Sequence, residues 1–131
     1  MSLSQIRVLV IDDELAIRVS LAAFLEDHGL QTRVAESGEK ALALLAAEPA
    51  DVAIVDIRLH GMDGHALILK AHEMMPSLKF LIFTGSADYH LPEGLARIGI
   101  TMHDIFRKPL ADLGVLADAA LRAAEGREEP P

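Results

Sequence analysis

The chain has 131 residues, of which 51% are hydrophobic, and it carries a net charge of −8. This length and composition predict a single folded domain with its own core, and the acidic balance without a basic cluster argues against direct nucleic-acid binding. The absence of cysteine excludes disulfides and thiolate metal sites, and the lack of a signal segment or a membrane-length apolar run predicts a cytoplasmic protein without membrane contact.

The first half of the chain alternates predicted strands with predicted helices. Strand-like runs bounded by turn residues predict strands at about 6–11, 31–35 and 52–56. Apolar residues at helical spacing predict helices at about 14–28, from Ser37 to just before Pro49, and from Asp63-Gly64 to Pro76. In the third of these helices we expect Leu67, Ala71 and Met74 to face inward.

The second half continues the alternation with one weakly patterned stretch. Its strands are predicted at about 79–84 and 103–107, and its last helix at about 110–125. Between the two strands, residues 85–102 hold only a short helix at about 92–98, with Pro92 in its first turn.

This alternation favours one architecture. Strands joined by helices require right-handed crossovers and a sheet covered on both faces, so the predicted fold class is α/β with a doubly wound, five-stranded parallel sheet. Five strands favour the order 2-1-3-4-5, the flavodoxin-like arrangement, with helices on both faces. In such sheets, ligands bind beyond the carboxyl ends of the strands.

Polar residues end or follow four of these strands. Asp12-Asp13 follows the first, Asp56 ends the third, Thr84 ends the fourth and Lys108 follows the fifth. In the predicted order, Asp56 lies between the Asp12-Asp13 pair and Thr84. Three carboxylates, a hydroxyl and an ammonium therefore meet at one edge, and this set of groups indicates a phosphate site.

The charge of this site predicts what binds there. Two carboxylates about 4 Å apart repel by roughly 4 kcal/mol at an effective dielectric constant of about 20, so three cannot ionise together without a counter-charge. Lys108 offsets one charge and a divalent cation matches the other two; an all-oxygen site with few protein ligands favours Mg²⁺. A carboxylate can also attack phosphorus, which makes Asp56 the candidate nucleophile, with Thr84 and Lys108 stabilising the transferred group.

Five short motifs, taken together, are more specific than any one of them. They are Asp12-Asp13-Glu14, Asp56, Met62-Asp63-Gly64, Thr84-Gly85 and Lys108-Pro109. In this order and spacing they closely resemble the receiver domain of two-component response regulators, over about residues 6 to 124. We expect residues 1–5 to be disordered or a cloning remnant and residues 125–131 to be a polar tail or linker. The chain is then either a complete single-domain regulator or part of a longer protein.

The resemblance implies a phosphoacceptor, and not an enzyme in the usual sense. Asp56 would accept a phosphoryl group from the phosphohistidine of a histidine kinase or a histidine phosphotransfer protein, with self-catalysed transfer and autodephosphorylation. The phosphorylated form would switch a surface that binds an unidentified downstream protein. A dimer that forms on phosphorylation is compatible with this role.

The resemblance also implies a ligand set for the metal. Asp13, Asp56 and the backbone carbonyl of Arg58 would bind Mg²⁺ directly, and Asp12 would contact a metal-bound water. Lys108 would contact the phosphoryl oxygens, and its bond to the following proline would be cis.

Positions around this site would tune the signal. Arg58 and Ser86 correspond to family positions that line the approach of water, so we expect them to modulate the lifetime of the phosphorylated state. Ile105 stands at the switch position, where the family usually carries an aromatic residue that turns with the hydroxyl residue. His60 stands where a proline is common. Recognition of the activated state would therefore differ from the usual one.

Two other function classes remain open. One is a receiver-like interaction module that is not regulated by phosphorylation. Ile105 leaves this alternative open, because it replaces the aromatic residue of the usual switch. The other is a Mg²⁺-dependent phosphatase with an aspartyl nucleophile; the acid expected two residues after that nucleophile is Arg58 here, and no substrate-binding cap is predicted.

Overall fold

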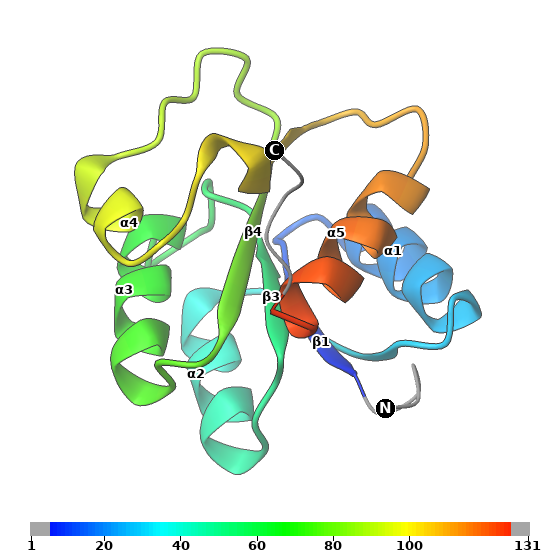
Figure 1. Ribbon diagram of the computed structural model, residues 1–131, viewed down its shortest axis with the longest axis horizontal. Helices are drawn as coiled ribbons and strands as arrows, with labels where there is room; N and C mark the ends of the chain where they lie inside the picture. The colour runs from blue at the N-terminus through cyan, green and yellow to red at the C-terminus, as the bar shows by residue number, and fades with distance from the viewer. Residues whose placement is uncertain (1–5, 127–131) are drawn as a thin grey trace.

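The structure is a computed structural model that describes residues 6–126 (Figure 1). Its five strands form one parallel sheet in the order β2-β1-β3-β4-β5, so the predicted fold class and strand order are confirmed. The strands are β1 (Arg7–Ile11), β2 (Gln31–Ala35), β3 (Val52–Val55), β4 (Lys79–Thr84) and β5 (Ile105–Arg107). The expectations for residues 1–5 and for the tail after residue 126 lie outside the described residues.

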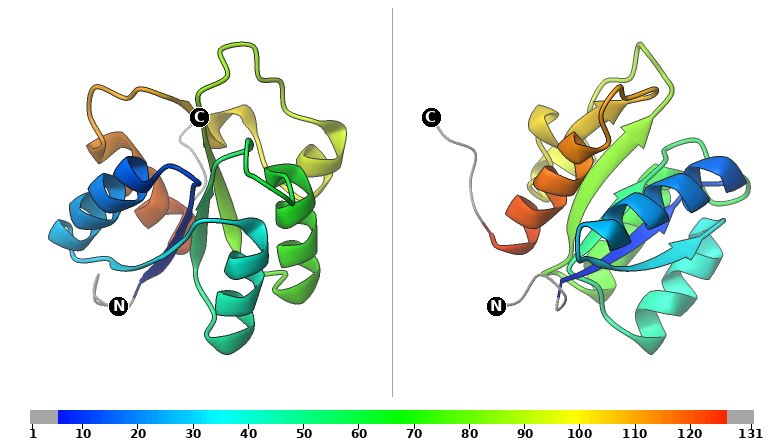
Figure 2. Two further views of the ribbon diagram at one scale, coloured as in Figure 1. Left: turned by 180° about the vertical axis from the view of Figure 1, so that it is seen from behind. Right: turned by 90° about the vertical axis from the view of Figure 1, so that its right-hand side faces the viewer.

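Helices cover both faces of the sheet (Figure 2). The helices are α1 (Leu15–Asp27), α2 (Gly38–Ala47), α3 (Gly64–Met74), α4 (Glu93–Arg97) and α5 (Gly114–Ala124). Buried residues of α1 and α5 share one core cluster with the sheet, and those of α2, α3 and α4 share the other. Within residues 6–126, none of the helices combines the length and the apolar character that crossing a bilayer requires.

Strand β1, which lies between β2 and β3, shows why the strands are recognisable in the sequence. Val8 and Val10 pack in the core on the α1 and α5 side, whereas Leu9 and Ile11 pack on the other side. All four are buried because successive side chains point to opposite faces and both faces are covered. The continuous apolar run therefore leaves polar groups no place except the ends of the strand.

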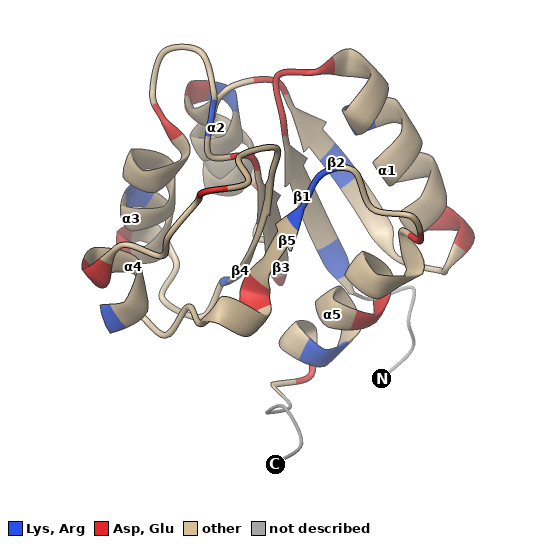
Figure 3. Ribbon diagram, turned by 90° about the horizontal axis from the view of Figure 1, so that it is seen from above, with Lys and Arg blue, Asp and Glu red and all other residues tan. Residues whose placement is uncertain are grey.

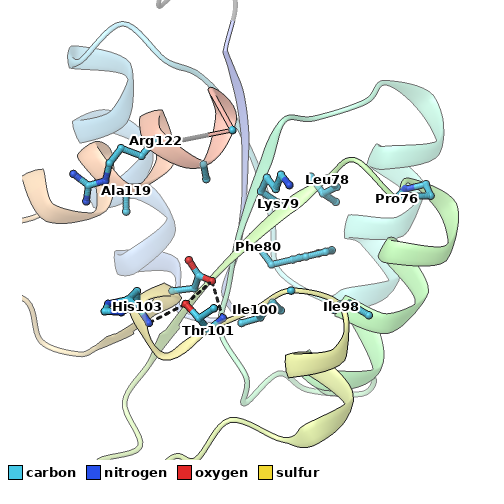
Figure 4. A pocket seen from close by; sticks show the side chains of 14 residues that line it. Pro76, Leu78, Lys79, Phe80, Ile98, Ile100, Thr101, His103, Ala119 and Arg122 are labelled. Atoms are coloured by element: carbon cyan, nitrogen blue, oxygen red, sulfur yellow. Dashed lines mark hydrogen bonds between the residues drawn. The ribbon is translucent and has the colours of Figure 1, made fainter. Parts of the chain in front are cut away.

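The strand predicted at 103–107 is shorter than expected. Its first residues belong to a 3₁₀ helix, η2 (Met102–Asp104), which Thr101 caps. The Thr101 hydroxyl oxygen accepts from the His103 amide (3.2 Å), and the Thr101 amide donates to Asp104 Oδ2 (2.9 Å), as Figure 4 shows. These local bonds compete with strand pairing, so β5 has only three residues.

Two helices also differ from their predicted bounds. The last helix begins at Gly114 and not at residue 110, because the Gly114 amide donates to Asp112 Oδ1 (2.8 Å) in a turn that precedes the helix. The segment before that turn contains the cis bond between Lys108 and Pro109. The helix expected at 92–98 spans five residues, Glu93–Arg97.

The prediction for the inward face of α3 is partly wrong. Leu67 and Ala71 are buried as expected, but Met74 is 47% exposed, and Ile68 is the other large buried residue of this helix. Met75, which caps the helix, packs against the core in place of Met74. The helix ends there, so the backbone turn and not the helical period decides which methionine points inward.

Candidate functional site

Three buried polar side chains lie at the carboxyl edge of the sheet, which Figure 3 views from above. Asp12, Asp56 and Thr84 are 2%, 5% and 0% exposed, and they are the only buried polar residues within residues 6–126. Asp12 follows β1, Asp56 follows β3, and Thr84 is the last residue of β4. Because β3 lies between β1 and β4, Asp56 occupies the middle of this row.

Lys108 joins the row from the end of β5. Its backbone amide donates to the Thr84 carbonyl (2.8 Å), which extends the pairing of β4 and β5 by one bond. The ammonium Nζ lies 2.7 Å from Asp12 Oδ2, 3.4 Å from Asp56 Oδ2 and 3.4 Å from Glu14 Oε1. A single cation thus bridges the ends of β1 and β3.

Burial and charge shift the pKa values of this cluster. Burial raises the pKa of Asp56, and the Asp12 carboxylate raises it further; the Arg58 amide and the Lys108 ammonium oppose this without cancelling it. Burial alone would lower the pKa of Lys108, but its hydrogen bond to Asp12 and the surrounding carboxylates outweigh burial and raise the pKa. Lys108 is therefore a permanent cation at neutral pH, next to a carboxyl group whose charged form is disfavoured.

The carboxylates at this edge have the chemistry of a hard cation site. Asp12, Asp13, Glu14 and Asp56 each offer one oxygen, and these four oxygens lie within 4.8 Å of one another. The ammonium of Lys108 compensates only part of their charge. An all-oxygen set with an excess of negative charge, open to water at Asp13, fits Mg²⁺, which prefers oxygen ligands and retains several waters.

Three further contacts to the acidic residues were not predicted from the sequence. His60 Nδ1 lies 2.9 Å from Asp13 Oδ2, on a side chain that is otherwise exposed, and Arg18 donates to the Asp12 carbonyl (2.8 Å). Glu14 adds its carboxylate to Lys108. No spacing rule predicts these pairs, because the loop carrying His60 and the turn carrying Glu14 are placed by tertiary packing.

The predicted modulating and switch residues surround the row. The Thr84 hydroxyl oxygen accepts from the Ser86 amide (3.1 Å), which leaves the hydroxyl proton able to bond another acceptor. The Arg58 amide donates to Asp56 Oδ1 (3.1 Å), whereas the Arg58 side chain is exposed. Ile105 is partly buried against the core on the α3 and α4 side.

A close backbone approach holds the loop after Asp56 in place. A Cβ atom at Gly64 would lie 2.7 Å from both the Asp56 carbonyl oxygen and Ile57 Cα. The Gly64 amide donates to the Ile57 carbonyl (2.9 Å), and Asp63 Oδ1 caps α3 by accepting from the Ala66 amide (2.9 Å). Glycine at this position therefore lets the start of α3 pack directly against the end of β3.

Comparison with known proteins gives a consistent result. A family model described as "Response regulator receiver domain" matches residues 8–120. The C4-dicarboxylate transport transcriptional regulatory protein DctD of Rhizobium meliloti is 34% identical over 122 residues, which are 93% of this chain and 25% of that protein. Sporulation initiation phosphotransferase F of Bacillus subtilis is 26% identical over 86% of this chain and 89% of that protein.

Solved structures share the fold. The receiver domain of NtrX from Brucella abortus has a TM-score of 0.80 at 32% identity, with 90% of this chain and 98% of that chain covered. A receiver domain from Clostridium thermocellum has a TM-score of 0.78 at 24% identity, over 92% and 95% of the two chains, and shows likeness of fold alone. The chain spans a quarter or less of the length of DctD and of the NtrX-like regulator of Rickettsia bellii.

Proposed function

The chain belongs to the response regulator receiver domain family, and on that premise we propose that it receives a phosphoryl group on the Asp56 carboxylate. One observation carries the proposal: the ammonium of Lys108 lies 2.7 Å from Asp12 and 3.4 Å from the buried Asp56 carboxylate. A carboxylate held beside a fixed cation can attack phosphorus, and the same cation can then stabilise the phosphoryl oxygens. We assign this role to a domain spanning residues 6–124.

The proposed donor is the phosphohistidine of a histidine kinase or a histidine phosphotransfer protein. An oxygen of Asp56 forms the new P–O bond while the P–N bond of the phosphohistidine breaks, and the electron pair of that bond leaves on the imidazole nitrogen. Lys108 and the hydroxyl of Thr84 donate hydrogen bonds to the phosphoryl oxygens. Water later cleaves the P–O bond and restores the Asp56 carboxylate.

We further propose that the acidic cluster holds Mg²⁺. Asp13, Asp56 and the backbone carbonyl of Arg58 would be direct ligands, with Asp12 acting through a bound water. When bound, the ion would neutralise the charge of the carboxylates and of the phosphoryl oxygens. The four carboxylate oxygens within 4.8 Å of one another, with Lys108 as their one ammonium partner among residues 6–126, support this assignment.

We predict that Mg²⁺ stabilises the protein. Binding to the native state adds RT ln(1 + [Mg²⁺]/Kd), so a concentration of about ten times Kd should raise the free energy of unfolding by about 1.4 kcal/mol. Urea unfolding with and without the ion measures this gain, and Ca²⁺ serves to test selectivity. A double variant, Asp12→Asn with Asp13→Asn, should lose the gain while keeping the side-chain shapes. An equal gain in that variant would place the metal elsewhere.

Arg58 is predicted to lengthen the lifetime of the phosphorylated state. Its exposed guanidinium follows Asp56 by two residues and can lie across the phosphoryl group, pairing with it bidentately and hindering in-line attack by water. Arg58→Ala should speed dephosphorylation several-fold without changing Mg²⁺ affinity, because only its backbone carbonyl is a proposed ligand. Ser86→Ala is the comparison variant, because Ser86 follows Thr84 by two residues just as Arg58 follows Asp56. Slower or unchanged phosphate release from the Arg58 variant would contradict the prediction.

A groove beside Lys108 is where we propose that the donor docks. It has a volume of about 420 Å³ and a mostly apolar lining from α1, the end of β4 and the segment before α5, including Leu21, Phe83 and Leu113. On α1, Leu15 and Val19 are exposed on neighbouring turns. An apolar helix face of the donor would cover these residues and bring its phosphohistidine to Asp56.

A labelling experiment tests the proposed function. The protein is incubated with acetyl phosphate and Mg²⁺, then analysed by intact-mass and peptide mass spectrometry. One phosphoryl adduct, on the peptide that contains Asp56, is expected. Continuous phosphate release without an accumulating adduct would indicate a phosphatase, and no adduct would indicate an interaction module.

A further inference from the structure

The loop that joins β4 to α4 carries the only tyrosine of the chain, which has no tryptophan. Tyr89 Oη and His65 Nε2, at the start of α3, share a hydrogen bond of 2.8 Å, and the two rings stack with centroids 5.6 Å apart. The Tyr89 carbonyl accepts from Arg107 Nη2 of β5 (3.1 Å). One loop residue thus links α3 to the edge strand.

Tyr89 is also linked to the row of site residues by two short steps. The Tyr89 amide donates to the Ser86 carbonyl (3.4 Å), and the Ser86 amide donates to the hydroxyl oxygen of Thr84 (3.1 Å). If Thr84 rotates about its Cα–Cβ bond to bring its hydroxyl to a phosphoryl group on Asp56, the hydroxyl oxygen itself moves and the Ser86 amide loses its acceptor. The backbone between Thr84 and Tyr89 must then rearrange to satisfy that amide.

The surroundings of Tyr89 make its position sensitive to such a rearrangement. Its ring packs against the same core cluster as Ile105, and burial raises its pKa to about 12, so its hydroxyl is neutral at physiological pH. Ile105 has no polar group that could exchange one partner for another. Tyr89, unlike Ile105, combines a partly buried ring with a hydrogen bond that can be broken.

We propose that Tyr89 couples the phosphoacceptor site to the surface between α3, α4 and β5. In the unphosphorylated protein, the contact between Tyr89 and His65 fixes the loop against α3. Phosphorylation of Asp56 moves the Thr84 hydroxyl away from the Ser86 amide. The loop then shifts, and the contact between Tyr89 and His65 breaks. A downstream protein would then bind the surface between α3, α4 and β5 that the movement of Tyr89 exposes. This inference rests on the proposed function, since it requires a phosphoryl group on Asp56.

Such coupling acts in both directions. If binding at Asp56 breaks the contact between Tyr89 and His65, the contact lowers the affinity of the site by some factor. Removing the contact by substitution must then raise the affinity by that factor. If Tyr89 had a purely structural role, substituting it would not raise the affinity of the site at Asp56. The affinity of the site for a phosphoryl mimic is therefore the readout that separates coupling from packing.

The experiment uses fluoroberyllate with Mg²⁺ as the phosphoryl mimic. Fluorine NMR reports whether the mimic is bound, with Asp56→Asn as the negative control, and the ring resonances of the single tyrosine report on Tyr89. Bound mimic with a large shift of the Tyr89 ring resonances is expected. Bound mimic with unchanged resonances would overturn the coupling and leave the proposed function standing, whereas no bound mimic would overturn both.

Two variants test the reciprocal effect. Tyr89→Phe keeps the ring but removes the hydroxyl, and His65→Asn removes the stacked ring; each should bind fluoroberyllate about threefold more tightly than the wild type. His72→Asn, two turns further along α3, is the matched control and should bind like the wild type. Unchanged or weaker binding in both test variants would overturn the proposal.

Discussion

The Asp56→Asn variant is expected to form no phosphoryl adduct while keeping the native fold. The substitution replaces the nucleophilic carboxylate by an amide of the same shape, and an amide oxygen is a far weaker nucleophile toward phosphorus. Asp12 lies in the same cluster and makes similar contacts, with Oδ1 accepting from the Glu14 amide and Oδ2 2.7 Å from Lys108, so the peptide that contains it must be examined as well. Intact-mass spectrometry after incubation with acetyl phosphate and Mg²⁺ measures the loss; full labelling of the variant at another residue would refute the assignment of Asp56.

The same variant should be at least as stable as the wild type at neutral pH without Mg²⁺. Burial raises the pKa of Asp56 above the ordinary value of an aspartate side chain, so the carboxyl binds its proton more tightly in the folded state than in the unfolded state. Stability is therefore lost as pH rises from about 4 through the raised pKa, and asparagine escapes that loss. Urea unfolding at neutral pH and near pH 4 should show the advantage of the variant shrinking at the lower pH.

Lys108→Ala should have the largest effect on stability. The substitution removes the cation that lies 2.7 Å from Asp12 and 3.4 Å from Asp56, whose side chains are almost completely buried. Breaking a buried ion pair costs about 3–5 kcal/mol, because a charge is left without a partner, and we expect the lower end because the cluster opens to water at Asp13. Mg²⁺ should restore part of the loss, and phosphorylation by acetyl phosphate should be strongly slowed.

Lys40→Ala is the matched control for this prediction. Lys40 lies on the surface of α2, 53% of its side chain is exposed, and its partner Glu36 is 3.7 Å away. Exposed pairs of this kind contribute roughly 0–1 kcal/mol, so the control should change the free energy of unfolding by less than about 1 kcal/mol. Similar losses in the two variants would show that the buried position of Lys108 has no special role. A smaller effect of Lys108→Ala in an Asp12→Asn background would confirm that the pair itself is responsible.

The amino-acid sequence by itself determined the sheet and the row of polar residues at its edge. Central strands buried on both faces are apolar at every position, as in Val8 to Ile11, so each strand and the polar residue that ends it stand out without any knowledge of packing. Alternation with helices then selects the strand order, and the strand order brings Asp12, Asp56 and Thr84 to one edge. Each of these steps depends only on local pattern and on topology.

Tertiary structure alone decided which groups pair within that edge and where the last elements begin. Lys108 lies closest to Asp12, Asp13 meets His60, and Tyr89 meets His65, although no repeat or spacing relates the members of these pairs. The edge strand β5 pairs on one side only, so its burial is incomplete and the local bonds of Thr101 shorten it. Loop conformation and side-chain pairing are set by long-range packing, because residues far apart in the sequence compete for the same few partners once the sheet has formed.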